Sequence, residues 1–75
     1  MSTDNIHNIL DAYCRFILKS GKEVYGVVMF ANDSNYYFAS NQDFQKYKAT
    51  QNPELLSNMM PLNVEDIILA EKLAS

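Results

Sequence analysis

The chain has 75 residues, a formal net charge of −3 and a sequence pI near 4.8, with one cysteine and one histidine. This size allows a single domain over residues 1–75, and the lone Cys14 and His7 exclude a disulfide and a Cys/His metal centre. Six basic against nine acidic residues disfavour nucleic-acid binding, because that binding depends on Lys and Arg side chains that neutralise phosphates.

The chemistry of the N-terminus and of the apolar segments indicates a cytoplasmic protein with no membrane partner. Met1–Asn5 is polar and lacks the basic region and apolar run of a secretory signal. No apolar stretch approaches the roughly 18 residues that a membrane-spanning helix needs. A single free thiol also suits a reducing compartment.

Residues 4–12 have the spacing of an amphipathic helix. Ile6, Ile9, Leu10 and Tyr13 lie at i, i+3, i+4 and i+7, which places them on one helix face. We therefore predict a short N-terminal helix whose apolar stripe lies on a sheet.

Three antiparallel strands are predicted next, over residues 13–19, 22–31 and 36–39. The first hairpin turn favours a three-residue loop in which Gly21 adopts a left-handed conformation. This loop pairs Leu18 with Lys22 and Phe16 with Val24, whereas a two-residue loop would place lysines opposite each other.

The resulting register divides the hairpin into two faces. The predicted core face holds Cys14, Phe16, Leu18, Val24, Gly26, Val28 and Phe30. The second face is unusually apolar for solvent, because it carries Ile17, Tyr25, Val27 and Met29. We expect a helix, the middle segment or another subunit to cover it, and these four residues are our candidate self-association face.

Gly26 lies in the middle of the second strand, where glycine weakens a strand and marks a sharp bend or a close backbone approach. A bend there would curl the sheet toward barrel closure.

The second half of the chain predicts two short helices and a closing strand. After an Asn-rich turn and the third strand, residues 42–49 and 53–58 indicate helices, the second with Pro53 at its first position. A turn over 64–66 then leads into a strand over 67–73, for which a C-terminal helix is the alternative.

No residue pattern indicates catalysis or a cofactor. Cys14 points into the predicted core, and His7 lies off the apolar stripe. The acidic residues show no spacing that forces a shared pocket, and the chain has no Gly-rich phosphate loop. We therefore expect a protein that is not an enzyme and that binds no cofactor and no metal.

The aromatic residues of the middle segment form our candidate partner surface. This surface comprises Tyr36, Tyr37, Phe44, Lys46, Tyr47 and Lys48. Exposed aromatic rings beside lysines stack on bases or grip a peptide. The alternative is structural: Phe44 and Tyr47 would anchor a helix on the sheet.

Three segments resemble the Sm-like and SH3-like small β-barrels: Leu18–Lys22, Val24–Val27 and Val64–Leu69. The resemblance implies a barrel. In Sm-like proteins the RNA site uses an Asp/Asn loop, which Asn32–Asn35 matches, and a late basic-Gly motif, which Ala70–Lys72 does not match. The resemblance therefore bears on fold more than on RNA binding.

We accordingly predict an α+β fold: a small, strongly bent antiparallel sheet or an SH3/Sm-like barrel, with a short N-terminal helix and one or two short helices before the last strand. The expected function is a non-enzymatic interaction domain that binds a protein partner or associates with itself. RNA or single-stranded nucleic-acid binding is the alternative. A third possibility is a ligand pocket between the middle helices and the sheet.

Overall fold

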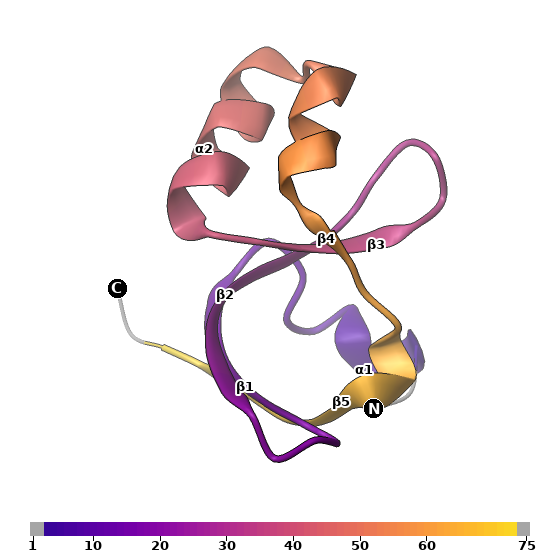
Figure 1. The fold of residues 1–75 in the computed structure, drawn as a ribbon, viewed down its shortest axis with the longest axis vertical. Helices are drawn as coiled ribbons and strands as arrows, with labels where there is room; N and C mark the ends of the chain where they lie inside the picture. Colours follow the sequence, from indigo (N-terminus) through magenta and orange to yellow (C-terminus); the bar gives the residue numbers. More distant parts are fainter. Residues whose placement is uncertain (1–2, 74–75) are drawn as a thin grey trace.

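The fold is an open antiparallel sheet with helical segments at its two ends (Figure 1). A computed structural model describes residues 3–73, so Met1 and Ser2 of the polar N-terminal segment lie outside the described part. Along the sheet the strand order is β4-β3-β2-β1-β5. The elements in chain order are α1 (Thr3–Ile6), β1 (Tyr13–Leu18), β2 (Glu23–Phe30), β3 (Tyr36–Ala39), α2 (Asn41–Thr50), η1 (Pro53–Asn58), β4 (Met60–Pro61), η2 (Val64–Asp66) and β5 (Ile67–Lys72), where η marks a 3-10 helix.

The α+β class is confirmed, but the sheet does not close into a barrel. β4 and β5 are its two edges, and each pairs with a single neighbouring strand. β4 is only two residues long and ends at Pro61, which has no backbone N–H to donate to a further strand. The barrel alternative is therefore wrong.

The first hairpin has the predicted register. Phe16 lies opposite Val24, and the backbone N–H of Leu18 donates to the carbonyl of Lys22 at 3.0 Å. Gly21 has φ +86°, the left-handed conformation that this turn requires.

The predicted N-terminal helix is wrong. Only one helical turn forms, α1, and the chain then continues through irregular turns to Asp11, whose φ is +64°. The backbone N–H of Asp11 donates to the carbonyl of Val28 at 2.9 Å, which ties this segment to the sheet. Ile6 and Ile9 are nevertheless buried. Their burial does not need a regular helix, and so short a helix has little stability of its own.

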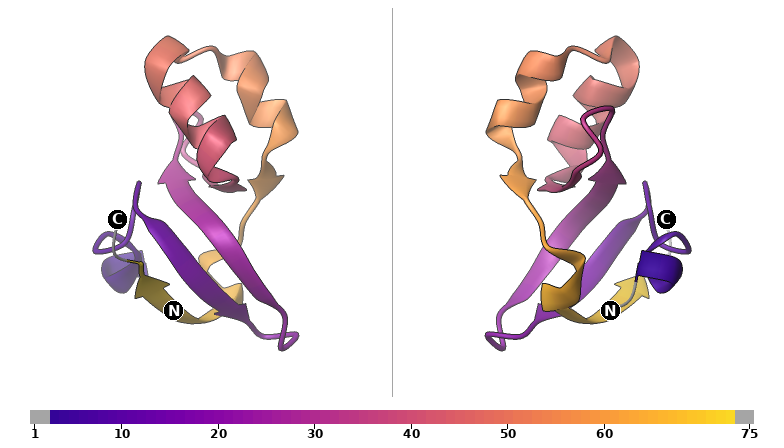
Figure 2. Two further views of the ribbon diagram at one scale, coloured as in Figure 1. Left: turned by 90° about the vertical axis from the view of Figure 1, so that its left-hand side faces the viewer. Right: turned by 90° about the vertical axis from the view of Figure 1, so that its right-hand side faces the viewer.

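The sheet packs apolar side chains on both of its faces, in two separate clusters. The first cluster lies against α1 and η2 and contains Ile6, Ile9, Cys14, Phe16, Val28, Val64 and Ile67. The second lies beneath α2 and η1 and contains Val27, Met29, Ala31, Ala39, Phe44, Tyr47 and Met59. Because successive residues of β2 point to opposite faces, this one strand contributes to both clusters. Figure 2 shows β2 running from its turn with β1 toward α2.

The middle helical segments form close to the predicted positions. α2 is capped by Ser40, whose hydroxyl oxygen accepts the Asp43 N–H at 3.1 Å. The second predicted helix is the 3-10 segment η1, capped by Asn52, whose side chain accepts the Glu54 N–H at 3.0 Å. None of the helical segments within residues 3–73 is long and apolar enough to cross a membrane.

The closing strand β5 is confirmed, and the C-terminal helix alternative is wrong. β5 pairs antiparallel with β1, with Ile17 opposite Leu69 and Leu18 opposite Ile67. The register shifts between these pairs, which leaves Ile68 exposed at an irregularity in the edge strand. Burial of Ile67 in the first cluster, together with the hydrogen bonds to β1, outweighs the helix propensity of the sequence.

Candidate functional site

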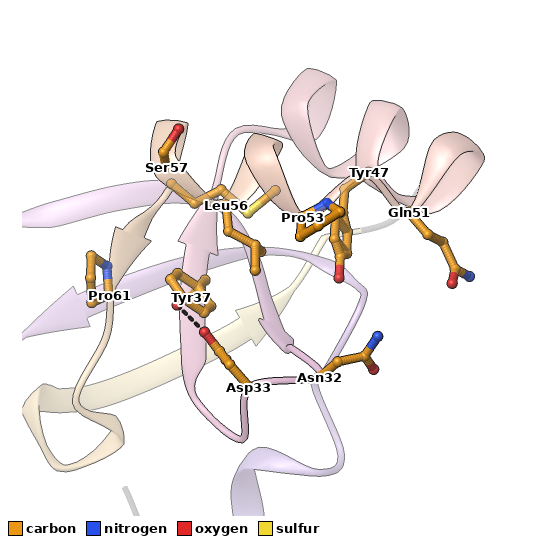
Figure 3. Close-up of a pocket in the computed structure, with 10 residues that line it drawn as sticks. Asn32, Asp33, Tyr37, Tyr47, Gln51, Pro53, Leu56, Ser57 and Pro61 are labelled. Atoms are coloured by element: carbon orange, nitrogen blue, oxygen red, sulfur yellow. Dashed lines mark hydrogen bonds between the residues drawn. The ribbon is translucent and has the colours of Figure 1, made fainter.

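An open groove lies between the helical segments α2 and η1 and the end of the sheet formed by β3 and β4 (Figure 3). Its volume is about 770 Å³, within the range of known ligand sites. We call it the helix–sheet groove. Its lining residues are Asn32, Asp33, Tyr37, Tyr47, Gln51, Pro53, Leu56, Ser57, Met59 and Pro61.

A second hollow adjoins this groove and shares with it Tyr37 and Pro61, which lie opposite each other in β3 and β4. Its volume is about 660 Å³. We call it the β4–η2 hollow. Its lining residues are Ser34, Asn35, Tyr36, Tyr37, Pro61, Leu62, Asn63, Val64 and Glu65.

Local backbone geometry brings the two sides of the helix–sheet groove together. At the end of α2, Gln51 adopts φ +52° and its N–H donates to the Tyr47 carbonyl at 2.6 Å. The chain then turns at Asn52, so that η1 packs back against α2. In the β2–β3 turn, Ser34 has φ +68° and its N–H donates to the Ala31 carbonyl at 3.0 Å.

The polar side of the groove is organised around Asp33. The hydroxyl of Tyr37 donates to Asp33 Oδ2 at 2.5 Å, and the N–H of Asn35 donates to Oδ1 at 3.0 Å. The Tyr37 hydrogen bond, with smaller help from Asn35, lowers the pKa of Asp33 below its ordinary value. The same bond raises the pKa of Tyr37. Asp33 is therefore a fixed negative charge at neutral pH.

Tyr47 contributes a hydroxyl to the groove from a buried ring. The residue is only 8% exposed, because its ring packs in the second cluster with Val27 and Met29. Figure 3 shows its hydroxyl pointing out of that cluster, toward the side of the groove that carries Asn32. Within residues 3–73 this hydroxyl has no hydrogen-bonding partner, so it is free to donate to or accept from a ligand.

The opposite side of the groove is largely apolar. Pro53 and Leu56 come from η1, Met59 directly follows η1, and Pro61 is the last residue of β4. The groove therefore combines an apolar wall with a wall of amide, hydroxyl and carboxylate groups. Such a combination suits binding and orientation of a ligand.

The tyrosines of the candidate partner surface are divided between several environments. Tyr37 lines both the helix–sheet groove and the β4–η2 hollow. Of these two spaces Tyr36 lines only the hollow, and its ring packs against Phe30 with 4.9 Å between centroids.

The α2 members of that surface also separate. Phe44 and the Tyr47 ring are buried beneath the helix, which is the structural role that we considered for them. Lys48 lies over the Phe44 ring, with its Nζ 6.0 Å from the centroid. Lys46 is exposed and lines neither the helix–sheet groove nor the β4–η2 hollow.

The candidate self-association face is covered at one end and open at the other. Val27 and Met29 are buried beneath α2 and η1, as members of the second cluster. Ile17 is half-buried and Tyr25 is exposed. We call the uncovered part, Tyr13, Ile17, Tyr25 and Leu69, the open sheet face.

The charged groups of the open sheet face are paired with one another. Arg15 forms an ion pair with Glu23, and the Tyr25 hydroxyl donates to the same carboxylate at 2.8 Å. The Arg15 hydrogen bond, followed by that from Tyr25, lowers the pKa of Glu23.

Cys14 lies in the first cluster, away from the groove. It is fully buried, and this burial raises the pKa of its thiol, with a smaller opposing effect from Lys72. A buried thiol of raised pKa is a poor nucleophile. Across residues 3–73 no three His, Cys, Asp or Glu side chains cluster closely enough to hold a metal ion.

Sequence reasoning missed most of the groove. The sequence places Asp33 in a turn and in the Asp/Asn loop of the small-barrel resemblance without assigning it to a groove, and it does not single out Gln51, Leu56 or Met59. The available signals were two chain reversals, the Asn-rich turn at 32–35 and the Asn52–Pro53 start. These signals locate loops, but they do not show that the loops meet.

No protein-family model, curated protein or solved structure matches this chain. The resemblance to small β-barrels therefore gains no support from these comparisons, and function is inferred from the site alone.

Proposed function

We propose that this chain is a non-enzymatic binding domain that holds a short segment of a partner protein in the helix–sheet groove. The observation that supports this most is the Tyr47 hydroxyl, a polar group on a buried ring that opens into the groove without a partner. A rigidly held donor and acceptor of this kind provides orientation at little entropic cost.

The shape and lining of the groove favour binding over catalysis. Its one carboxylate, Asp33, is held in place by Tyr37 and Asn35. The apolar wall formed by Leu56 and Pro61 offers contact area for side chains of a peptide. Because the groove is open rather than enclosed, it suits a chain that enters and leaves at both ends.

The test is an NMR titration of the isotope-labelled chain with a library of short, extended peptides. We expect amide signals around the groove, from residues 32–37 and 51–61, to shift on binding. Tyr47→Phe should weaken the binding of a selected peptide roughly threefold to tenfold, the usual effect of one lost hydrogen bond. Tyr13→Phe is the matched control, because it also removes only a hydroxyl, and Tyr13 lies on the open sheet face rather than in the groove. A library in which no peptide shifts these signals would contradict the proposal.

Self-association is a second candidate, favoured by the open sheet face. Tyr13, Tyr25 and Leu69 are exposed large side chains gathered on three adjacent strands. This face covers β1 and β5, which have six residues each, and the part of β2 beside them, or roughly 20 × 14 Å and about 300 Å². A stable dimer buries about 800 Å² on each partner, so this face by itself supports only weak association.

Sedimentation velocity over a wide concentration range tests this second candidate. We expect a monomer at low concentration and reversible dimers at high concentration. Leu69→Lys should remove the dimer, whereas Gln45→Lys, which adds the same charge on the exposed side of α2, should leave it unchanged. Dimers that persist in Leu69→Lys would exclude the open sheet face as the interface.

Nucleic-acid binding is less well supported than either candidate. Tyr47 is one of the aromatic residues proposed to stack on bases, and its ring is buried. Within residues 3–73 no Lys or Arg lines the helix–sheet groove, so a phosphate backbone would meet Asp33 without a compensating cation.

A further inference from the structure

The helix–sheet groove and the β4–η2 hollow adjoin at Tyr37 and Pro61, which line both, and we call the two together the path. A ligand that fills the first and extends past this pair enters the second. β4, which carries Pro61, is an edge strand whose outer side pairs with no other strand in residues 3–73. The two volumes together exceed the space that a single small molecule needs, and the path suits an extended chain.

The charged residues that line this path are both acidic. Of the described residues that line the two spaces, Asp33 in the groove and Glu65 in the hollow carry a formal charge, and none is Lys, Arg or His. The Asp33 carboxylate accepts one hydrogen bond on each oxygen, which leaves lone pairs for a further donor. The path is therefore complementary to a cation and repels an anion.

One aromatic ring of the path adds to this preference. Tyr37 is half-buried and lines the groove beside Asp33 (Figure 3). An ammonium or guanidinium group near a tyrosine ring gains from the negative face of the ring, and a carboxylate at the same place strengthens that attraction. The Tyr47 hydroxyl supplies an additional acceptor.

We infer that the path binds an extended peptide segment that carries Lys or Arg side chains among apolar ones, with one cationic group at Asp33 and the neighbouring apolar side chain against Leu56 and Pro61. This rests on the proposed function, and it assigns the chemistry of the partner segment. A second basic side chain that extends into the hollow would meet Glu65.

The experiment compares matched peptides on the full chain by NMR titration. Three peptides share the same apolar residues and carry, at alternate positions, arginine, glutamine or glutamate. We expect the arginine peptide to bind at least tenfold more tightly than the glutamine peptide and the glutamate peptide not to bind. Shifts should appear at residues of both spaces, including Asn32 and Asn63.

Asp33→Asn tests the assigned residue. Its amide oxygen can still accept from the Asn35 N–H, and its amide NH2 can donate to the Tyr37 hydroxyl, so the turn is kept while the charge is lost. We expect this variant to lose most of the preference for the arginine peptide, with a fivefold or greater loss of affinity. Glu71→Gln, the same kind of change on the exposed part of β5, is the control and should bind as the unmodified chain does.

The outcomes separate the inference from the proposed function. If no peptide binds, both fail. If the glutamine peptide binds as tightly as the arginine peptide, or Asp33→Asn changes nothing, the proposed function stands and the basic-segment inference is overturned. Two other ligands also test the basic-segment inference. It is overturned if free n-butylguanidinium binds as tightly as the peptide, because the site would then be one for a small cation. It is likewise overturned if a short single-stranded RNA shifts the same NMR signals.

Discussion

The backbone carbonyl of Ala39 approaches Gly26 so closely that a Cβ atom at Gly26 would lie 2.6 Å from its oxygen. The ring of Phe38 would meet the same Cβ atom at 2.6 Å. Gly26 therefore marks the close backbone approach that its position in the strand predicted, at the point where β2 changes from pairing with β1 to pairing with β3.

Gly26→Ala should destabilise the fold by about 1–3 kcal/mol, because β3 must move away and disturb both clusters. Urea denaturation of the two proteins measures this difference. Gly21→Ala is a useful contrast, since Gly21 has open space around it and loses only about 1 kcal/mol through its positive φ. A Gly26→Ala protein as stable as the unmodified chain would show that the strands are not held at this distance.

Phe16 and Phe30 should respond very differently to truncation. Both were placed on the core face by alternation, but Phe16 is 1% exposed and Phe30 is 50% exposed. Phe16→Ala should cost about 3–5 kcal/mol, a large part of the stability of so small a domain. Phe30→Ala should cost much less, since it loses mainly the contact with Tyr36. Equal losses in thermal or chemical denaturation would contradict the packing described above.

Cys14 should react with thiol reagents only when the protein opens. It is fully buried, and burial raises the pKa of its thiol, so little thiolate is present at neutral pH. We expect modification by a chromogenic disulfide reagent to be slow in buffer and fast in denaturant. Rapid labelling of the folded protein would show that the first cluster opens easily.

The Asp33–Tyr37 hydrogen bond should make stability depend on pH in the acid range. Because the folded pKa of Asp33 is lowered, its contribution is fully present above the unfolded value of about 3.9 and is lost as pH falls through the folded value. A carbon-detected NMR titration of the Asp33 carboxyl should show the lowered midpoint. Tyr37→Phe should move that midpoint back toward the ordinary value, and an unchanged midpoint would exclude this hydrogen bond as the cause.

Much of the sheet followed from local chemistry. The Gly21 turn specified the β1–β2 register, and Asn52 with Pro53 marked the start of η1. The predicted turn over residues 64–66 is confirmed as η2, which lies directly before β5. These features depend on a few neighbouring residues and on the alternation of side chains along a strand, so they are visible in sequence.

Other features depended on contacts between distant segments. Ile6 and Ile9 are buried as the spacing indicated, yet irregular turns bury them, because contact with the sheet stabilises that segment more than its helix propensity does. Val27 and Tyr25 belong to one face of β2, but α2 and η1 cover only Val27 and leave Tyr25 exposed. Strand alternation specifies a face, and it does not specify which part of that face a later helix will cover.

The sequence by itself determined the α+β class, the register of the first hairpin and the net negative charge, and at Gly26 it left a bend or a close approach, of which the structure shows the second. Only the tertiary structure decided that the sheet stays open and that Asp33, Tyr47 and Leu56 meet around one groove. The physical reason is that these three side chains come from a turn, a helix and a 3-10 segment. Their convergence depends on the packing of the whole chain rather than on any local pattern.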